Sequence, residues 1–503
     1  MSFENIYNSL LHASRERATL GSCAALLGWD EQTYMPRGGA EHRANQSALL
    51  AGLIHDRATD PKLGAWLATA ETTSPGHPPD HPASVNLREW RRDFDRATKL
   101  PRALVEALAH ATSIGQQQWV DAKSARDFTQ FQPALETILN LKRQEAACLG
   151  KSESDYDALI DDYEPGASTE ELRTMFETLR AQLVPLLDRI QGGPAQPDPA
   201  TLIGDFPIEH QRIFCEMMAA AVGFDFDRGR LDVTAHPFCT DIGPGDCRIT
   251  TRYDVHDFTD SFFSVMHETG HALYEQGLDP AHHGTPLGQS VSLGIHESQS
   301  RLWENAVARG IEFWHYAFPL ARRVFHAGLR NLPLAQFHAA VNRVAPSLIR
   351  VQADELTYNL HIIIRFELEQ ALLSGDLPCQ SLPAAWAEKY QQYLGIQPSN
   401  DAEGCLQDVH WSAGLFGYFP TYTLGNLYAA QLFAKAAETL GDLPAQIARG
   451  EFRNLLDWLR HAIHSHGKRH APRELIAAAT GSPPDPRHLI TALSQKAARI
   501  CAT

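Results

Sequence analysis

The sequence predicts a large, mainly α-helical protein, because apolar residues recur every three or four positions along most of the chain. The pattern is clearest in "YNLHIIIRFELEQALL" at 358–373 and "RLWENAVARGIEFWHYAF" at 301–318. Proline and glycine clusters, such as the one at 72–84, interrupt it only briefly, so we interpret them as loops between helices. We therefore predict a single helical domain over residues 1–503, with an N-terminal helical portion of about residues 1–80.

One segment, 231–253, has the alternating pattern of β-strands, around a Gly-Pro-Gly turn at 243–245. It predicts a small β-hairpin, whose edge strand could hold an extended peptide or could only brace the helix that follows. Cys239 and Cys247 flank the turn and could face each other. The eight cysteines are spread singly along the chain, so free thiols are expected there rather than a disulfide.

The charge balance argues against nucleic acid as a partner. Lys and Arg number 44 against 60 Asp and Glu, which leaves a formal net charge of −16 without a basic run. Glu4, Arg15, Glu16 and Arg17 interrupt the N-terminal region where a signal peptide needs an apolar core, and no run approaches the ~18 apolar residues of a membrane span. These features predict a soluble cytoplasmic protein without a membrane partner.

The segment "HETGH", which begins at His267, has the spacing of a zinc-binding helix. Residues four apart lie on one face of a helix, so His267 and His271 can reach one cation while Glu268 stands beside it. Asp257 is placed to cap this helix and Gly277 to end it. From these residues alone, two hydrogen-bonded core histidines remain an alternative to a metal site.

A catalytic zinc ion needs three protein ligands and one open position. Metzincins take a histidine as the third ligand, but Tyr274 and Gly277 occupy the positions where that motif has Gly and His, which excludes the class. Glu275 lies on the histidine face, about 12 Å along the axis from His267, too far to share the ion. The third ligand must therefore come from another helix.

A second helical pattern begins after Gly294 and carries the best candidate, Glu297. It would return antiparallel to the first helix and complete a set of two histidines and one glutamate. Arg301 and Glu304 follow at four and seven positions, on the same face, where they could orient the ligand from outside. His296 and Glu304 remain rival ligands at this point.

At these residues the chain resembles the Taq-type metallocarboxypeptidases, the carboxypeptidase Taq family. The resemblance covers nearly the full length in the expected order. It rests on "LGWDEQTYMPRGGAEHRANQ" (27–46), "YDALIDDYEPG" (156–166), "HPF" (236–238), "DCRITTRY" (246–253), "HETGH" (267–271), "HESQSRLWE" (296–304), "IRVQADELTYNLH" (349–361) and "GCLQDVHWSAGLFGYFPTYTLGN" (404–426). The family commonly has Val where this chain has Cys247.

This resemblance implies a helical single-domain zincin with a deep central cleft, flanked by the N-terminal portion and with the small hairpin beside the HExxH helix. It also implies Zn²⁺ as cofactor, with Co²⁺ as a substitute, and a homodimer. The implied activity is removal of the C-terminal residue from peptides that have a free C-terminus.

In such a site zinc acidifies water, and Glu268 takes the proton as the water attacks the peptide carbonyl. Donors for the oxyanion are offered by His410, Tyr418 and Tyr422, of which Tyr422 is preferred by resemblance to related zinc peptidases. An aromatic segment of this kind can equally be plain core.

The resemblance further implies that Arg350 binds the substrate carboxylate, for which a guanidinium fork is suited. From the residues alone, an ordinary ion pair with Asp354 four positions on is the alternative. His236, in "HPF", is a further expected substrate-binding residue. Competing functions are a zinc oligopeptidase that cuts internal bonds, a noncatalytic helical protein with a structural metal, and a helical binding protein without metal.

Overall fold

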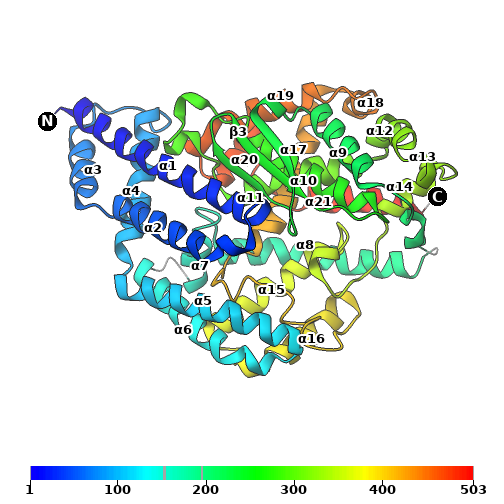
Figure 1. The fold of residues 1–503 in the computed structure, drawn as a ribbon, viewed down its shortest axis with the longest axis horizontal. Helices are drawn as coiled ribbons and strands as arrows, with labels where there is room; N and C mark the ends of the chain where they lie inside the picture. The colour runs from blue at the N-terminus through cyan, green and yellow to red at the C-terminus, as the bar shows by residue number, and fades with distance from the viewer. Residues whose placement is uncertain (1, 151–153, 194–195, 502–503) are drawn as a thin grey trace.

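A computed structural model describes residues 2–150, 154–193 and 196–501. It confirms the predicted fold class, a mainly helical protein with one small sheet (Figure 1). The helices of the N-terminal half are α1 (Phe3–Thr33), α2 (Ala40–Ala58), α3 (Pro61–Thr73), α4 (Pro82–Lys99), α5 (Arg102–Ala125), α6 (Gln132–Leu149), α7 (Asp155–Ile160), α8 (Thr169–Gln191) and α9 (Ile208–Val222).

The C-terminal half continues the helical pattern after the sheet, and short 3-10 turns join many of its elements. Its helices are α10 (Phe258–Glu275), α11 (Leu293–Arg301), α12 (Ile311–Val324), α13 (His326–Leu329), α14 (Leu334–Val341), α15 (Thr357–Ser374), α16 (Leu382–Leu394), α17 (Pro420–Leu440), α18 (Leu443–Ala448), α19 (Arg453–Ala462), α20 (Pro472–Thr480) and α21 (Arg487–Cys501). Between α11 and α12 the chain forms a π-helical segment, Leu302–Ala308.

A large hydrophobic core runs through most of these helices, and Trp303, Trp314 and Trp386 are fully buried in it. A second, smaller cluster joins α1, α3 and α4 through Leu10, Leu67 and neighbouring apolar residues. In Figure 1 these N-terminal helices lie at one end of the molecule and the C-terminus at the other. The assignment of residues 1–503 to one domain, with residues 1–80 flanking a cleft, stays a prediction.

The predicted hairpin is confirmed, and it is part of a three-stranded sheet. Strands β2 (Cys239–Gly243) and β3 (Asp246–Thr251) pair antiparallel around the turn. The hairpin prediction missed a third strand, β1 (Gly229–Val233), which pairs parallel with β3 and gives the order β1-β3-β2. Two parallel strands cannot be joined by a tight turn. The alternating pattern of the hairpin therefore does not reveal which other segment pairs with β3.

The sheet packs against the helix that follows it. This contact is the one expected if the hairpin braces that helix. Both β2 and β3 contact α10, and the N-terminal helix α1 packs on β2. Trp29 of α1 lies against two sheet arginines, 5.1 Å from the Arg230 guanidinium and 4.1 Å from that of Arg248. The peptide-binding role of the edge strand stays a prediction. Among the described residues no helix is long and apolar enough to cross a membrane.

Candidate metal centre and substrate site

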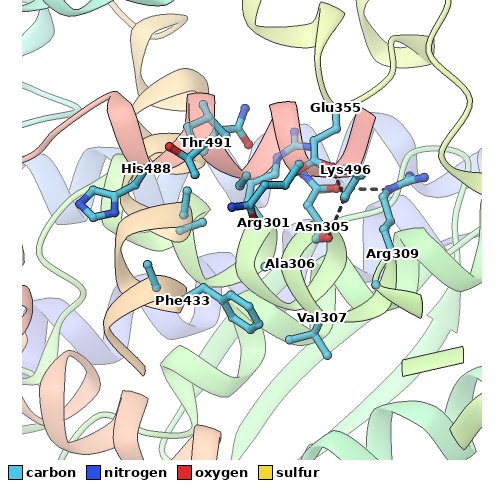
Figure 2. A pocket seen from close by; sticks show the side chains of 18 of the residues that line it. Arg301, Asn305, Ala306, Val307, Arg309, Glu355, Phe433, His488, Thr491 and Lys496 are labelled. Carbon is cyan, nitrogen blue, oxygen red and sulfur yellow. Dashed lines mark hydrogen bonds and ion pairs between the residues drawn. The ribbon is translucent and has the colours of Figure 1, made fainter. Parts of the chain in front are cut away.

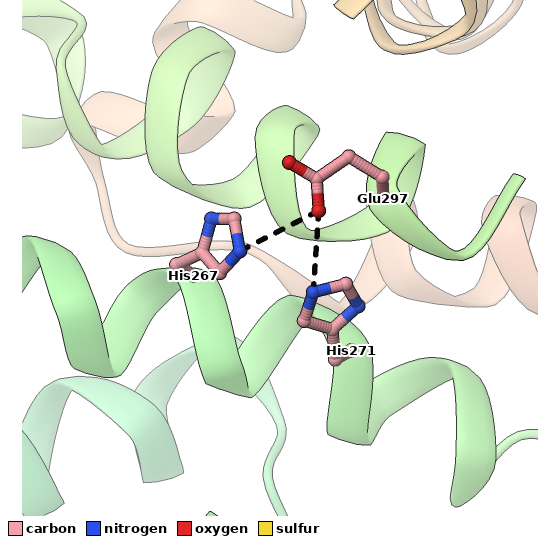
Figure 3. A group of neighbouring side chains, drawn as sticks. All are labelled: His267, His271 and Glu297. Atoms are coloured by element: carbon pink, nitrogen blue, oxygen red, sulfur yellow. Dashed lines mark ion pairs between the residues drawn. The ribbon is translucent and has the colours of Figure 1, made fainter. Parts of the chain in front are cut away.

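Helix α10 presents both histidines of the HETGH segment. Asp257 caps it, as predicted, by accepting a hydrogen bond from the backbone N–H of Thr259 at 2.8 Å. Its apolar face is buried against the core, and this face comprises Phe258, Phe262, Val265, Met266 and Leu273. The opposite face carries His267 and His271, whose side chains point toward α11 (Figure 3).

Glu297 of α11 meets the two histidines. Its Oε2 lies 3.6 Å from Nε2 of His267 and 3.4 Å from Nε2 of His271. Two ligand atoms bound at 2.0–2.2 Å to one tetrahedral ion lie about 3.4 Å apart, so this spacing fits a zinc-type ion. Within the described chain, these three residues form the one group of potential metal ligands whose ligand atoms all lie within 4.8 Å of one another.

The second nitrogen of each imidazole is held by an acidic residue, directly or through another histidine. Nδ1 of His267 lies 3.0 Å from Oε2 of Glu304. Nδ1 of His271 lies 2.5 Å from Nδ1 of His296, whose Nε2 lies 2.7 Å from Oε1 of Glu275. These contacts leave both Nε2 atoms facing Glu297, the arrangement that orients histidine ligands around a metal.

This geometry separates the rival ligands from the primary candidate. His296 and Glu304 contact the Nδ1 atoms of the histidines, so they lie on the side away from the shared Nε2 position. Burial disfavours the charged form of His271, and the neighbouring His296 adds to this, which lowers the pKa of His271 to about 3. A neutral imidazole is the form that binds a metal.

Arg301 is the last residue of α11. It connects Glu297 of that helix with Glu304 of the π-helical segment that follows. Its Nε donates to Oε1 of Glu297 at 2.7 Å and its Nη1 to Oε2 of Glu304 at 3.3 Å. Burial opposes ionisation of Glu297, but Arg301 and His267 outweigh it and hold the pKa of that carboxyl well below its usual range. Glu297 is therefore charged at neutral pH, as a metal ligand must be.

The candidate base, Glu268, is 7% exposed and stands beside the ligand group. Burial raises its pKa to about 7, and the negative charges of Glu297 and Glu304 act in the same direction. A carboxyl group with a pKa near 7 can both accept and return a proton, which suits the predicted role.

Arg350 is buried, but its partner is not the one that the sequence suggested. Its Nε donates to Oδ1 of Asp408 at 2.9 Å and its Nη1 to the hydroxyl of Tyr358 at 2.9 Å. The alternative to carboxylate binding, an ion pair of Arg350 with Asp354, is contradicted, because Arg350 pairs with Asp408 instead. Asp354 accepts hydrogen bonds from the backbone N–H groups of Leu356 and Thr357 at the start of α15. A carboxylate in this position satisfies N–H groups that have no partner within the helix.

Tyr358 connects the arginine to the metal centre. The Arg301 guanidinium lies 4.5 Å from the centre of the Tyr358 ring, whose hydroxyl binds Arg350. Neither Asp408 nor Tyr358 was identified from the sequence as a site residue. The only sequence signal for Asp408 is its position two residues before His410, in a segment already singled out.

The three candidate oxyanion donors lie together where the 404–419 segment enters α17. The Tyr422 hydroxyl is 3.2 Å from Nε2 of His410, and the rings of Tyr418 and Tyr422 are 5.4 Å apart. Burial raises the pKa of Tyr422 well above its usual range, so its hydroxyl stays a donor. Burial also lowers the pKa of His410 to about 4, which keeps that imidazole neutral. The Tyr422 ring lies 5.1 Å from the Arg350 guanidinium.

Three further residues with sequence-based predictions, His236, Cys239 and Cys247, lie in or next to the hairpin. His236 is exposed on the segment that joins β1 to β2, and its substrate-binding role stays a prediction. Cys239 and Cys247 do face each other, with their sulfur atoms 3.6 Å apart, and both are free thiols. The expectation of free thiols at the hairpin is therefore confirmed.

Arg301 also borders an open pocket of about 670 Å³, lined by residues of the π-helical segment, α17 and α21 (Figure 2). Lys496 lies on this pocket and forms an ion pair with Glu355. The lining does not include His267, His271 or Glu297. This pocket therefore adjoins the metal centre at Arg301 and is separate from the space in front of the ligands.

Comparisons with known proteins show the family to which the chain belongs. Residues 9–497 match the family model described as carboxypeptidase Taq (M32) metallopeptidase. The chain is 49% identical to thermostable carboxypeptidase 1 of Thermus thermophilus, over 99% of this chain and 100% of that one. It is 39% identical to carboxypeptidase 1 of Bacillus subtilis, over 94% of each chain.

Solved structures show the same fold. An M32 carboxypeptidase from Deinococcus radiodurans superposes with a TM-score of 0.96 and 41% identity, over 99% of this chain and 100% of that chain. The resemblance noted in the sequence is confirmed over nearly its whole length: the chain belongs to the carboxypeptidase Taq (M32) family of metallopeptidases.

Proposed function

We propose that this metallocarboxypeptidase holds zinc with His267, His271 and Glu297 and uses Glu268 as its base to release the C-terminal residue of peptides. Family membership supplies the class of reaction, a metal-dependent cleavage at the C-terminus. The observation that carries the residue assignment is the spacing of 3.6 and 3.4 Å between the Glu297 carboxylate and the two Nε2 atoms. Two imidazoles and one carboxylate are the ligand set of several zinc peptidases, and Co²⁺ suits the same donors.

A bound divalent metal supplies Lewis acidity toward water and toward the peptide carbonyl. Glu268 then takes the proton of the attacking water on a carboxylate oxygen and delivers it to the leaving nitrogen. Tyr422 donates its hydroxyl proton in a hydrogen bond to the oxygen of the carbonyl under attack, and His410 orients that hydroxyl. Tyr418 packs against Tyr422 and borders the substrate.

Arg350 is the proposed receptor for the free carboxylate. A guanidinium has five N–H donors, and hydrogen bonds to Asp408 and Tyr358 use two of them, while Nη2 lies 2.9 Å from the same oxygen of Asp408. The other N–H groups on the two Nη atoms are proposed to form the fork that binds a carboxylate with two parallel hydrogen bonds. Asp408 also keeps the buried Arg350 charged, since it raises the pKa of that guanidinium against the effect of burial.

The partners follow from this chemistry. Substrates are peptides with a free C-terminus, and His236 is proposed to contact them from the β1–β2 connection. A homodimer and a cytoplasmic location are proposed on the family resemblance and on the composition of the chain, which carries a formal charge of −16.

The test compares one peptide as its free acid and as its C-terminal amide. The zinc-loaded protein should release the last residue of the free acid and leave the amide nearly intact, and removal of the metal by a chelator should abolish the activity. Cleavage of internal bonds in both peptides would instead favour an oligopeptidase. Full activity after verified metal removal would contradict the proposed metal site.

A further inference from the structure

A buried glutamate outside the ligand set, Glu164, binds the start of the helix that carries Glu297. It is 2% exposed and follows α7 in a turn that the function described above does not use. Its Oε2 accepts a hydrogen bond from the backbone N–H of Gly294 at 3.0 Å, and its side chain is also hydrogen-bonded to Ser292. Ser292 is itself the N-cap of α11, accepting from the N–H of Ile295 at 3.1 Å.

The same carboxylate joins α11 to α17. Its Oε1 accepts from the hydroxyl of Tyr428 at 2.9 Å, and Tyr428 lies on α17. One turn earlier on that helix, Gly425 lies against Glu297, because a Cβ atom there would be 2.4 Å from Cγ of Glu297. Helix α11 is therefore fixed at its first turn by Glu164 and at its metal-binding residue by α17.

The turn that carries Glu164 is also anchored. The backbone carbonyl of its neighbour Tyr163 accepts a hydrogen bond from the N–H of Leu293 at 2.9 Å, next to the Glu164 contact. Asp161 in the same turn forms an ion pair with Arg92 of α4 at 2.9 Å. A carboxylate held in this way at a helix start satisfies free N–H groups and interacts favourably with the helix dipole.

We propose that Glu164 is a positioning residue for the metal centre, which sets the place of Glu297 through the N-terminus of α11 and its contact with α17. The inference rests on the proposed role of Glu297 as a ligand. Gly294 lies one turn before Glu297 on this helix, so a shift of a few tenths of an ångström at Gly294 would also move Glu297. Glu164 does not touch the ligands, so its effect should appear in metal binding itself.

The chain offers a matched control in Glu369. This glutamate is also fully buried, and burial raises its pKa, like that of Glu164, to about 7. It likewise accepts from a tyrosine hydroxyl, that of Tyr156 at 2.7 Å, and from a backbone N–H, that of Gly417 at 3.1 Å. Its partners belong to α7 and the 404–419 segment, and none of them lies on α11.

The experiment measures the dissociation constant for Zn²⁺ by competition with a chromogenic chelator, and the visible absorption of the Co²⁺-loaded protein. Glu164→Gln replaces one acceptor oxygen with an amide donor and should weaken Zn²⁺ binding by about 10–100-fold and alter the Co²⁺ spectrum. Glu369→Gln should leave the dissociation constant and the spectrum unchanged. Equal dissociation constants for the wild type and folded Glu164→Gln would overturn the proposal.

A milder pair of variants covers the case in which Glu164→Gln does not fold. Tyr428→Phe removes one hydrogen bond from Glu164 and should weaken Zn²⁺ binding, whereas Tyr156→Phe removes the matching bond from Glu369 and should not. Equal binding by the two tyrosine variants would count against Glu164. Glu297→Ala tests the proposed function separately: wild-type Zn²⁺ affinity in that variant would refute the ligand set, whatever the Glu164 variants show.

Discussion

Asp408 holds the guanidinium of Arg350 in place, with Nε of the arginine donating to Oδ1 of the aspartate at 2.9 Å and Nη2 at 2.9 Å from the same oxygen. The other oxygen of Asp408 accepts from Nε of Arg365 at 2.7 Å. Arg350 and Arg365 outweigh the effect of burial and hold the pKa of Asp408 well below its usual range. One partly buried carboxylate thus fixes the orientation of the proposed substrate receptor.

The first prediction concerns Arg350 itself. Arg350→Ala should raise KM and lower kcat/KM for free-acid peptides by about 2 kcal/mol or more, because the substrate carboxylate loses two charge-assisted hydrogen bonds. Arg350→Lys should restore little, since an ammonium group cannot form the fork. The measurement is the hydrolysis of matched free-acid and amide peptides, with metal content determined in parallel. An equal loss on both substrates would mean that Arg350 only stabilises the fold.

A second prediction follows for Asp408. Asp408→Asn keeps the size of the side chain but removes the charge that orients Arg350, so KM for free-acid peptides should rise while kcat changes less. Metal content should remain full, because Asp408 contacts the arginines and not the ligand group. A fall in kcat at unchanged KM would contradict this reading of the pair.

Glu268 gives the sharpest test of the chemistry. Glu268→Gln should keep stoichiometric metal and lose nearly all turnover, because an amide cannot accept the proton of the attacking water. The swap is nearly isosteric, so thermal stability should change little. Activity near that of the wild type, with metal content measured on the same sample, would remove Glu268 from the mechanism.

The two acidic residues on the ligand helix should differ in how strongly they retain metal. Glu297→Ala removes a proposed direct ligand and should abolish tight binding. Glu304→Ala instead removes contacts with Nδ1 of His267 and with Arg301 and Arg309, outside the ligand set, and should weaken binding by about 10–100-fold. Metal analysis after dialysis against graded chelator concentrations distinguishes the two. The reverse order of losses would exchange their roles.

The pairing of the proposed ligands His267 and His271 could be predicted from the sequence because it depends on local periodicity. Positions four and seven apart share a helix face, which placed His267 with His271 and also Glu297 with Arg301 and Glu304. Arg301 still contacts Glu304, although Glu304 lies in a π-helical segment, where the regular α-helical spacing no longer applies.

The contacts that the sequence did not reveal join distant segments. Asp408 follows Arg350 by 58 positions, and Glu164 lies 130 positions before Gly294. The path of the intervening chain decides such contacts, and helical periodicity carries no information about that path. The parallel strand β1 was missed for the same reason, since its partner β3 is reached only through another strand.

The last prediction concerns the pH dependence of stability and uses Glu369. Burial raises the pKa of this glutamate from 4.5 to about 7 in the folded protein, despite hydrogen bonds from Tyr156, Trp411 and Gly417 that act in the opposite direction. Between these values the unfolded chain has lost the proton and the folded protein keeps it, so the folded state binds more protons. The contribution of Glu369 to the free energy of unfolding is therefore fully present below pH 4.5 and declines as the pH rises toward 7.

The decline amounts to about 1.4 kcal/mol per pH unit, or about 3 kcal/mol across the window. Glu369→Gln stays neutral at every pH, so this part of the dependence should vanish in the variant. Urea unfolding of the metal-free proteins between pH 4.5 and 7 measures it, because without metal the protonation of His267 and His271 is not coupled to zinc release. The free energy of unfolding of the wild type should fall relative to that of Glu369→Gln as the pH increases. Parallel curves would show that Glu369 is ionised in the folded protein, with its hydrogen bonds outweighing the effect of burial.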